Sequence, residues 1–120
     1  MANTLLVTDD ALIIREMIKD TAIQAGWEIL GEACNGKEAV EQYNELQPDV
    51  MTLDMVMPDY DGLYALREII AEHPDAKVLV VSALDQKSVL KDAFKIGATD
   101  FIVKPFDHDL FVETLNKMVS

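Results

Sequence analysis

Residues 49–62 read DVMTLDMVMPDYDG, an apolar run followed at once by the carboxylate of Asp54. Pro58 disfavours helical geometry at Met57, so the chain must turn before any helix begins. A helix-capping role for Asp54 is therefore less natural than for most aspartates, although a solvated turn remains an alternative. The stretch predicts a buried strand that carries a chemically used acid at its carboxyl end.

Around this stretch, five short strand-like runs alternate with five segments of helical spacing. Three of the runs are nearly continuous hydrophobics, which is typical of strands covered on both faces. The predicted strands span 4–8, 28–32, 49–53, 77–81 and 101–103, and the predicted helices span 11–24, 36–46, 62–72, 86–96 and 107–118. This alternation predicts one α/β domain over residues 1–120, a doubly wound five-stranded parallel sheet with helices on both faces. One broad apolar face is expected on the first helix, made by Leu12, Ile13, Met17, Ile18 and Ile23.

Composition argues against several classes of function. Ten basic and 22 acidic residues give a formal net charge of −12, which opposes binding to nucleic acid or to an anionic membrane surface. The chain opens MANTLLVTDD, with two acids before a signal-peptide core could form, and its apolar runs are far too short to span a bilayer. We expect a monomeric, cytoplasmic protein. The lone Cys34 permits no internal disulfide and is expected to be partly buried.

Polar side chains stand where four of the predicted strands end. They are Asp9 and Asp10 after the first strand, Asp54 after the third, Ser82 after the fourth and Lys104 after the fifth. In parallel sheets these ends meet at one edge, where ligands bind. Three neighbouring carboxylates repel one another unless a cation lies among them, and hard oxygen ligands suit Mg²⁺. The set predicts a magnesium site where Asp54 attacks a phosphoryl group while Lys104 and Ser82 hold its oxygens.

Each of these residues also has a simpler interpretation. Asp9 or Asp10 could cap the helix that follows, and Ser82 could cap the helix starting near Gln86. Lys104, taken alone, is more naturally a solvated lysine. Only the joint arrangement at one sheet edge favours the functional interpretation.

Together the motifs resemble the receiver domain of two-component response regulators. The resemblance rests on the acid pair 9–10, LDMVMP at 53–58, VVSA at 80–83 and FIVKPF at 101–106, and it covers essentially the whole chain in order. It implies a flavodoxin-like sheet with strand order 2-1-3-4-5. It also implies that Asp54 accepts a phosphoryl group from a sensor histidine kinase, with Mg²⁺ as cofactor.

The resemblance implies a role for each matching residue. Mg²⁺ would be ligated by Asp10, Asp54 and the backbone carbonyl of Val56, with Asp9 acting chiefly through water. Lys104 would bind the phosphoryl group, and its peptide bond to Pro105 is expected to be cis. Ser82 and Phe101 match the switch residues: the hydroxyl moves towards a new phosphoryl group, and the aromatic ring rotates into the space this leaves.

Three positions depart from the usual receiver pattern. Thr8 stands where an apolar residue is usual, and we expect a local hydrogen bond to satisfy its hydroxyl. Val56 and Leu84 occupy positions that resemble gates over the phosphoryl group, and both are apolar. Water should therefore be poorly oriented there, which predicts slow loss of the phosphoryl group.

The resemblance implies a signalling phosphoacceptor rather than an enzyme. We expect a stand-alone chemotaxis-type regulator that receives phosphate from a histidine kinase or histidine phosphotransferase and binds an output protein such as a flagellar motor switch component. A phosphorelay intermediate, or a receiver from a longer transcriptional regulator, is the alternative. A haloacid-dehalogenase-like phosphatase would need an acid where Val56 stands, and a flavodoxin would not place two acids in its phosphate loop.

Overall fold

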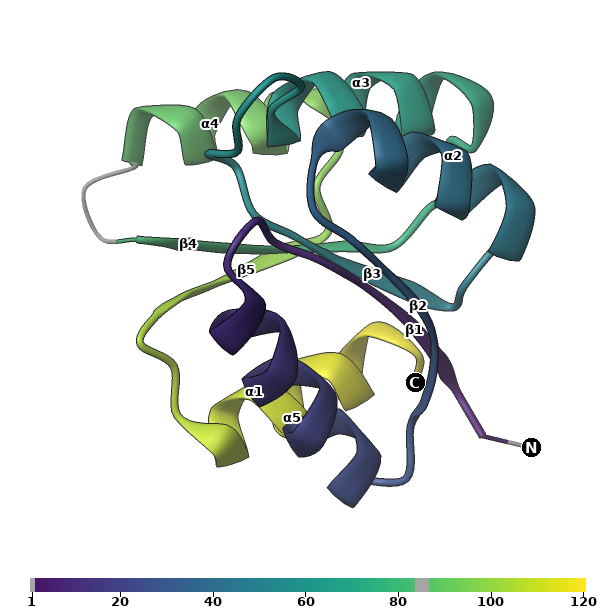
Figure 1. Cartoon of the computed structure of the whole chain (residues 1–120), viewed down its shortest axis with the longest axis vertical. Coiled ribbons are helices and arrows are strands. Elements are labelled where there is room, and N and C mark those ends of the chain that lie inside the picture. The colour runs from purple at the N-terminus through teal and green to yellow at the C-terminus, as the bar shows by residue number, and fades with distance from the viewer. Residues whose placement is uncertain (1, 84–86) are drawn as a thin grey trace.

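The computed structural model of the protein describes residues 2–83 and 87–120. Five strands and five helices alternate along these residues: β1 (Thr4–Thr8), α1 (Leu12–Gln24), β2 (Glu28–Ala33), α2 (Gly36–Leu46), β3 (Val50–Leu53), α3 (Gly62–Glu72), β4 (Val78–Ala83), α4 (Lys87–Ile96), β5 (Asp100–Lys104) and α5 (His108–Met118). All strand pairs are parallel and the sheet order is β2-β1-β3-β4-β5. Figure 1 shows α1 and α5 on one face of the sheet and α2, α3 and α4 on the other. The predicted doubly wound fold is confirmed.

The central strands send alternate side chains into two separate hydrophobic clusters. In β1, Leu6 joins the cluster beneath α2, α3 and α4, whereas Leu5 and Val7 join the cluster beneath α1 and α5. This alternation follows from the two-residue period of a strand. Because both faces are covered, the central strands are mostly apolar, with the buried Thr52 of β3 as an exception, and polar groups gather at their carboxyl ends.

Helix α1 packs through a different face from the one predicted. Ile18 and Ala22 are buried and Ile14 packs against the same cluster, so the contact row runs at intervals of four residues. The remaining apolar residues of the predicted face are exposed, namely Leu12, Ile13, Met17 and Ile23. The prediction was wrong because this helix carries more apolar residues than its contact with the sheet and α5 covers.

The ends of two predicted strands and the exposure of Cys34 also differ from the prediction. Ser82 lies inside β4, opposite Val103, and Lys104 is the last residue of β5, so neither simply follows its strand. Cys34 is exposed rather than partly buried, and its thiol donates to Glu38 Oε1 at 3.2 Å. Gln86, the predicted first residue of the fourth helix, lies outside the described residues.

Thr8 does not receive the hydrogen bond that we expected. Its hydroxyl is buried and has no partner among the described residues. A buried hydroxyl without a partner costs about 1–3 kcal/mol, because it loses its bonds to water and gains none.

Replacing Thr8 with Val should therefore stabilise the protein, because the shape is kept and the unpaired hydroxyl is removed. We expect the free energy of unfolding to rise by about 1 kcal/mol, measured by urea titration at an unchanged m-value. Thr21→Val is the matched control, because the Thr21 hydroxyl donates to Met17 O at 2.9 Å, so this change should give no gain. A Thr8→Val protein less stable than wild type would contradict the explanation.

Candidate functional site

Three carboxylates meet at the carboxyl edge of the sheet. Asp9 and Asp10 follow β1, and Asp54 follows the neighbouring strand β3, where its N–H donates to Thr8 O at 3.1 Å. One carboxylate oxygen from each acid lies within 4.8 Å of the other two. Asp9 and Asp54 are buried, whereas Asp10 is exposed. The structure thus brings together the three acids that the strand ends predicted.

Asp9 is held by contacts on both carboxylate oxygens. Oδ1 accepts the N–H of Ala11 at 2.9 Å, and Oδ2 accepts from Lys104 Nζ at 2.8 Å. The residue at the N-cap of α1 is Ala11, with no side-chain capping bond, so neither acid acts there as a conventional cap. Since both Asp9 oxygens are engaged, Asp10 and Asp54 are the acids best placed to offer oxygens to a cation.

Lys104 brings a positive charge to the cluster from the end of β5. Its Nζ lies 2.8 Å from Asp9 Oδ2 and 3.6 Å from Asp54 Oδ1. The peptide bond from Lys104 to Pro105 is cis, the geometry that the resemblance implied. Three carboxylates and one ammonium leave a formal charge of −2 when all are ionised, which a divalent cation such as Mg²⁺ would balance.

The environment of Asp54 makes its negative charge costly. Burial, with the neighbouring charge of Asp9 as a second cause, raises the pKa of Asp54 to about 6, although Lys104 opposes the shift. A cation bound among the acids would favour the ionised form. The donor set and the charge deficit therefore fit a hard divalent ion.

Ser82 and Phe101 differ sharply in exposure. Ser82 Oγ is buried in β4, adjacent to β3, and has no hydrogen-bond partner within the described part of the chain. The Phe101 ring on β5 is 42% exposed and meets Phe94 of α4 edge to face, with centroids 5.9 Å apart. A buried hydroxyl without a partner would gain from a new acceptor nearby.

The loop after Asp54 is held by two close backbone approaches that the sequence analysis missed. A Cβ on Gly62 would overlap the Asp54 carbonyl oxygen, and a Cβ on Gly36 would overlap the carbonyls of Tyr60 and Asp61. The N–H of Gly36 donates to Tyr60 O at 2.6 Å, so the start of α2 fastens the loop. The Asn-Gly and Asp-Gly pairs in the sequence were the available signal.

Val56 and Arg15 also contact the acids at this edge of the sheet. The half-exposed Val56 donates its N–H to Asp54 Oδ1 at 3.4 Å. The second predicted gate, Leu84, lies outside the described residues. Arg15 of α1 contacts the backbone of Asp9, and nothing in the sequence motifs indicated this contact.

Asp54→Asn should stabilise the protein free of divalent cations, and the gain should grow with pH. The folded protein binds the Asp54 proton more tightly than the unfolded chain does, so wild-type stability falls as pH rises from about 4 to about 6. At about 1.4 kcal/mol per pKa unit, the advantage of Asp54→Asn over wild type in free energy of unfolding should grow by about 3 kcal/mol across this range. Urea unfolding in chelator at pH 4 and pH 8 measures this.

The same measurement in saturating Mg²⁺ provides the control, because a bound cation should relieve the wild-type cost and narrow the gap at pH 8. A gap that is the same at both pH values would show that repulsion and burial at Asp54 are not its cause.

Comparison with known proteins agrees with this geometry. The family model described as "Response regulator receiver domain" matches residues 5–116. The chemotaxis protein CheY of Thermotoga maritima is 48% identical over 118 residues, which cover 98% of each chain. The CheY of Bacillus subtilis is 45% identical over 120 residues, which cover 100% of each.

Solved structures share the fold. A chain from the CheX–CheY–BeF3–Mg²⁺ complex of Borrelia burgdorferi superposes with a TM-score of 0.93 at 30% identity, covering 98% of this chain and 90% of that one. The response regulator domain of Thermotoga maritima CheB gives a TM-score of 0.86 at 34% identity, covering 99% and 95%. On the sheet order, the acid cluster and these matches, the chain belongs to the response regulator receiver domain family.

Proposed function

We propose that this receiver is a phosphorylation-controlled signalling protein whose phosphoacceptor is Asp54. The observation that carries the proposal is the cluster of Asp9, Asp10 and Asp54 with Lys104 Nζ at 2.8 Å from Asp9 and 3.6 Å from Asp54. A carboxylate beside an ammonium and two further acids suits the binding of a phosphoryl group together with a divalent cation. The phosphodonor is the phosphohistidine of a sensor histidine kinase or a histidine phosphotransferase.

The residues of the site divide the transfer among them. A carboxylate oxygen of Asp54 attacks phosphorus; the P–N bond of the phosphohistidine breaks, and its electron pair stays on the imidazole. Mg²⁺, held by Asp10, Asp54 and the Val56 carbonyl with Asp9 through water, would neutralise charge on the acids and the phosphoryl oxygens.

Lys104 and Ser82 receive the transferred group. The Lys104 ammonium turns from Asp9 to a phosphoryl oxygen, and the unpaired Ser82 hydroxyl donates to another. The protein thus promotes the transfer of the phosphoryl group to its own Asp54. It passes the signal on by binding a partner, and not by turning over a substrate.

The switch acts through β5 and the helices beside it. Movement of Ser82 towards the phosphoryl group opens space into which Phe101 can turn from its half-exposed position against Phe94. The face formed by α4, β5 and α5 also exposes Leu110, and a shallow pocket there is lined by Phe101, Phe106 and Leu110. A partner that prefers the turned-in ring would bind the phosphorylated protein more tightly.

The setting that the comparisons support is chemotaxis. Relatives named CheY are close to half identical to the chain over nearly their whole length. The output partner that we propose is accordingly a component of the flagellar motor switch or a similar chemotaxis protein, bound by a monomeric receiver in the cytoplasm. Among residues 2–83 and 87–120, no helix is long and apolar enough to cross a membrane.

A small phosphodonor tests the chemistry directly. Acetyl phosphate with Mg²⁺ should add one phosphoryl group, seen as a single labile adduct by intact mass, because the cluster itself assembles the groups needed. Asp54→Ala should give no adduct, and omission of Mg²⁺ should abolish it in the wild type. Wild-type protein that stays unmodified, while a known receiver is modified in parallel, would overturn the proposal.

The apolar residue at position 56 should slow dephosphorylation. An amide side chain there could orient the attacking water, so Val56→Asn should shorten the lifetime of the phosphorylated protein several-fold, as follows from the contribution of water positioning to hydrolysis. Decay is followed by the loss of adduct mass after donor removal.

Leu84→Glu tests the second predicted gate in the same assay, and Val56→Leu is the matched apolar control. Unchanged lifetimes in both polar variants would contradict the gating hypothesis.

A further inference from the structure

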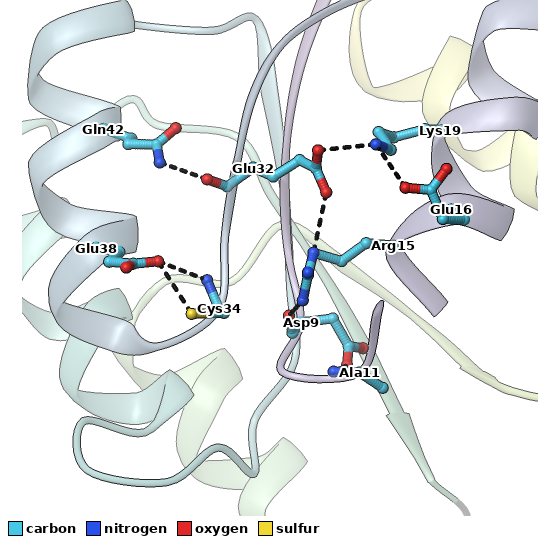
Figure 2. Close-up of polar contacts among 9 residues, drawn as sticks. All are labelled: Asp9, Ala11, Arg15, Glu16, Lys19, Glu32, Cys34, Glu38 and Gln42. Carbon is cyan, nitrogen blue, oxygen red and sulfur yellow. Dashed lines mark hydrogen bonds and ion pairs between the residues drawn. The ribbon is translucent and has the colours of Figure 1, made fainter. Parts of the chain in front are cut away.

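Arg15 reaches from α1 to the backbone of the acid pair. Its Nη1 donates to Asp9 O at 2.7 Å, and its Nε donates to Glu32 Oε1 at 3.0 Å. The side chain is only 15% exposed. Figure 2 shows the guanidinium lying between these two acceptors, so one planar group links α1, the loop that follows β1, and β2.

Glu32 is itself held in place at both ends. Its carboxylate accepts from Lys19 Nζ at 2.8 Å, and its backbone carbonyl accepts from Gln42 Nε2 (Figure 2). The hydrogen bond from Lys19, with that from Arg15, holds the pKa of Glu32 below its ordinary value. Glu32 is thus a charged anchor, and it orients the Arg15 fork by an ion pair.

Asp9 is fastened at four polar atoms. Besides the two carboxylate contacts, its N–H donates to Ala33 O at 3.1 Å, and its carbonyl receives the Arg15 bond. The carbonyl belongs to the peptide that joins Asp9 to Asp10. Because a peptide unit is planar, fixing the direction of this carbonyl also fixes where the Asp10 backbone leaves the strand.

We propose that Arg15 is a positioning residue for the metal site, which sets the spacing of the Asp10 carboxylate from Asp54 through its bond to the Asp9 carbonyl. The proposal rests on the proposed function, since it concerns the same cation. The competing explanation is that Arg15 only ties α1 to β2 and acts on a bound cation through its charge alone.

The two explanations predict opposite signs. Arg15 places a positive charge beside the acids, so Coulomb's law alone predicts that removing it would strengthen binding of a divalent cation. Loss of positioning predicts weaker binding, and the removal of a residue that orients metal ligands typically costs about 10–100-fold in affinity. Whether removal of Arg15 weakens or strengthens cation binding therefore shows whether Arg15 acts by positioning Asp10 or only by its charge.

The experiment measures Mn²⁺ binding to the full chain without a phosphodonor, from the EPR signal of the free ion. We expect Arg15→Met to bind Mn²⁺ about tenfold more weakly than wild type, while circular dichroism reports an intact fold. Lys37→Met is the charge-matched control: it removes a cation from the first turn of α2 that contacts neither Glu32 nor Asp9, so its affinity should equal that of wild type or exceed it slightly.

Arg15→Lys keeps both the charge and the long side chain, and it supplies the test if Arg15→Met fails to fold. A single ammonium cannot reproduce the two directed donors, so Arg15→Lys should also bind Mn²⁺ more weakly than wild type. Wild-type or tighter binding by the folded Arg15 variants would overturn the inference. Weak binding by wild type itself, with no acetyl phosphate adduct, would instead reject the proposed function.

Discussion

The site exists because three carboxylates are held closer together than free acids would remain. Asp9 and Asp54 sit at the ends of adjacent buried strands, so they cannot relieve their repulsion by moving apart. The cost appears in the raised pKa of Asp54 and is partly offset by the ammonium of Lys104. Backbone N–H donors from Ala11 and Val56 offset more of it. The arrangement therefore suits a divalent cation, or a phosphoryl group with its three acceptor oxygens.

The parallel sheet explains why such a cluster can be rigid. Strands covered on both faces allow little lateral movement, and their carboxyl ends deliver side chains to one edge. The loop that carries Asp54 is then closed by backbone contacts at Gly36 and Gly62, where any side chain would collide with a carbonyl. Rigidity of this kind favours catalysis of phosphoryl transfer, because positioning and electrostatics supply most of the rate.

Sequence patterns predicted the elements better than the contacts between them. Helices α2 and α3 begin and end at the predicted residues, because Asn35 and Asp61 cap them and the periodicity is clean. The prediction of the buried face of α1 was wrong, because apolar residues lie around most of this helix and their spacing alone does not indicate which of them are buried. The acids were found because strand ends in a parallel sheet share an edge. Arg15 was not, because a side-chain bond to a backbone carbonyl leaves no motif.

The contact between Phe94 and Phe101 has a consequence for signalling in the resting cell. An edge-to-face aromatic pair is worth about 0.5–1.5 kcal/mol, and in the proposed switch this contact is lost when Phe101 turns inward. It would therefore lower the fraction of unphosphorylated molecules in the turned-in arrangement by roughly two- to tenfold. In the proposed switch, the pair would thus keep the output of unphosphorylated molecules low, so that each phosphorylation event would produce a larger relative change in output.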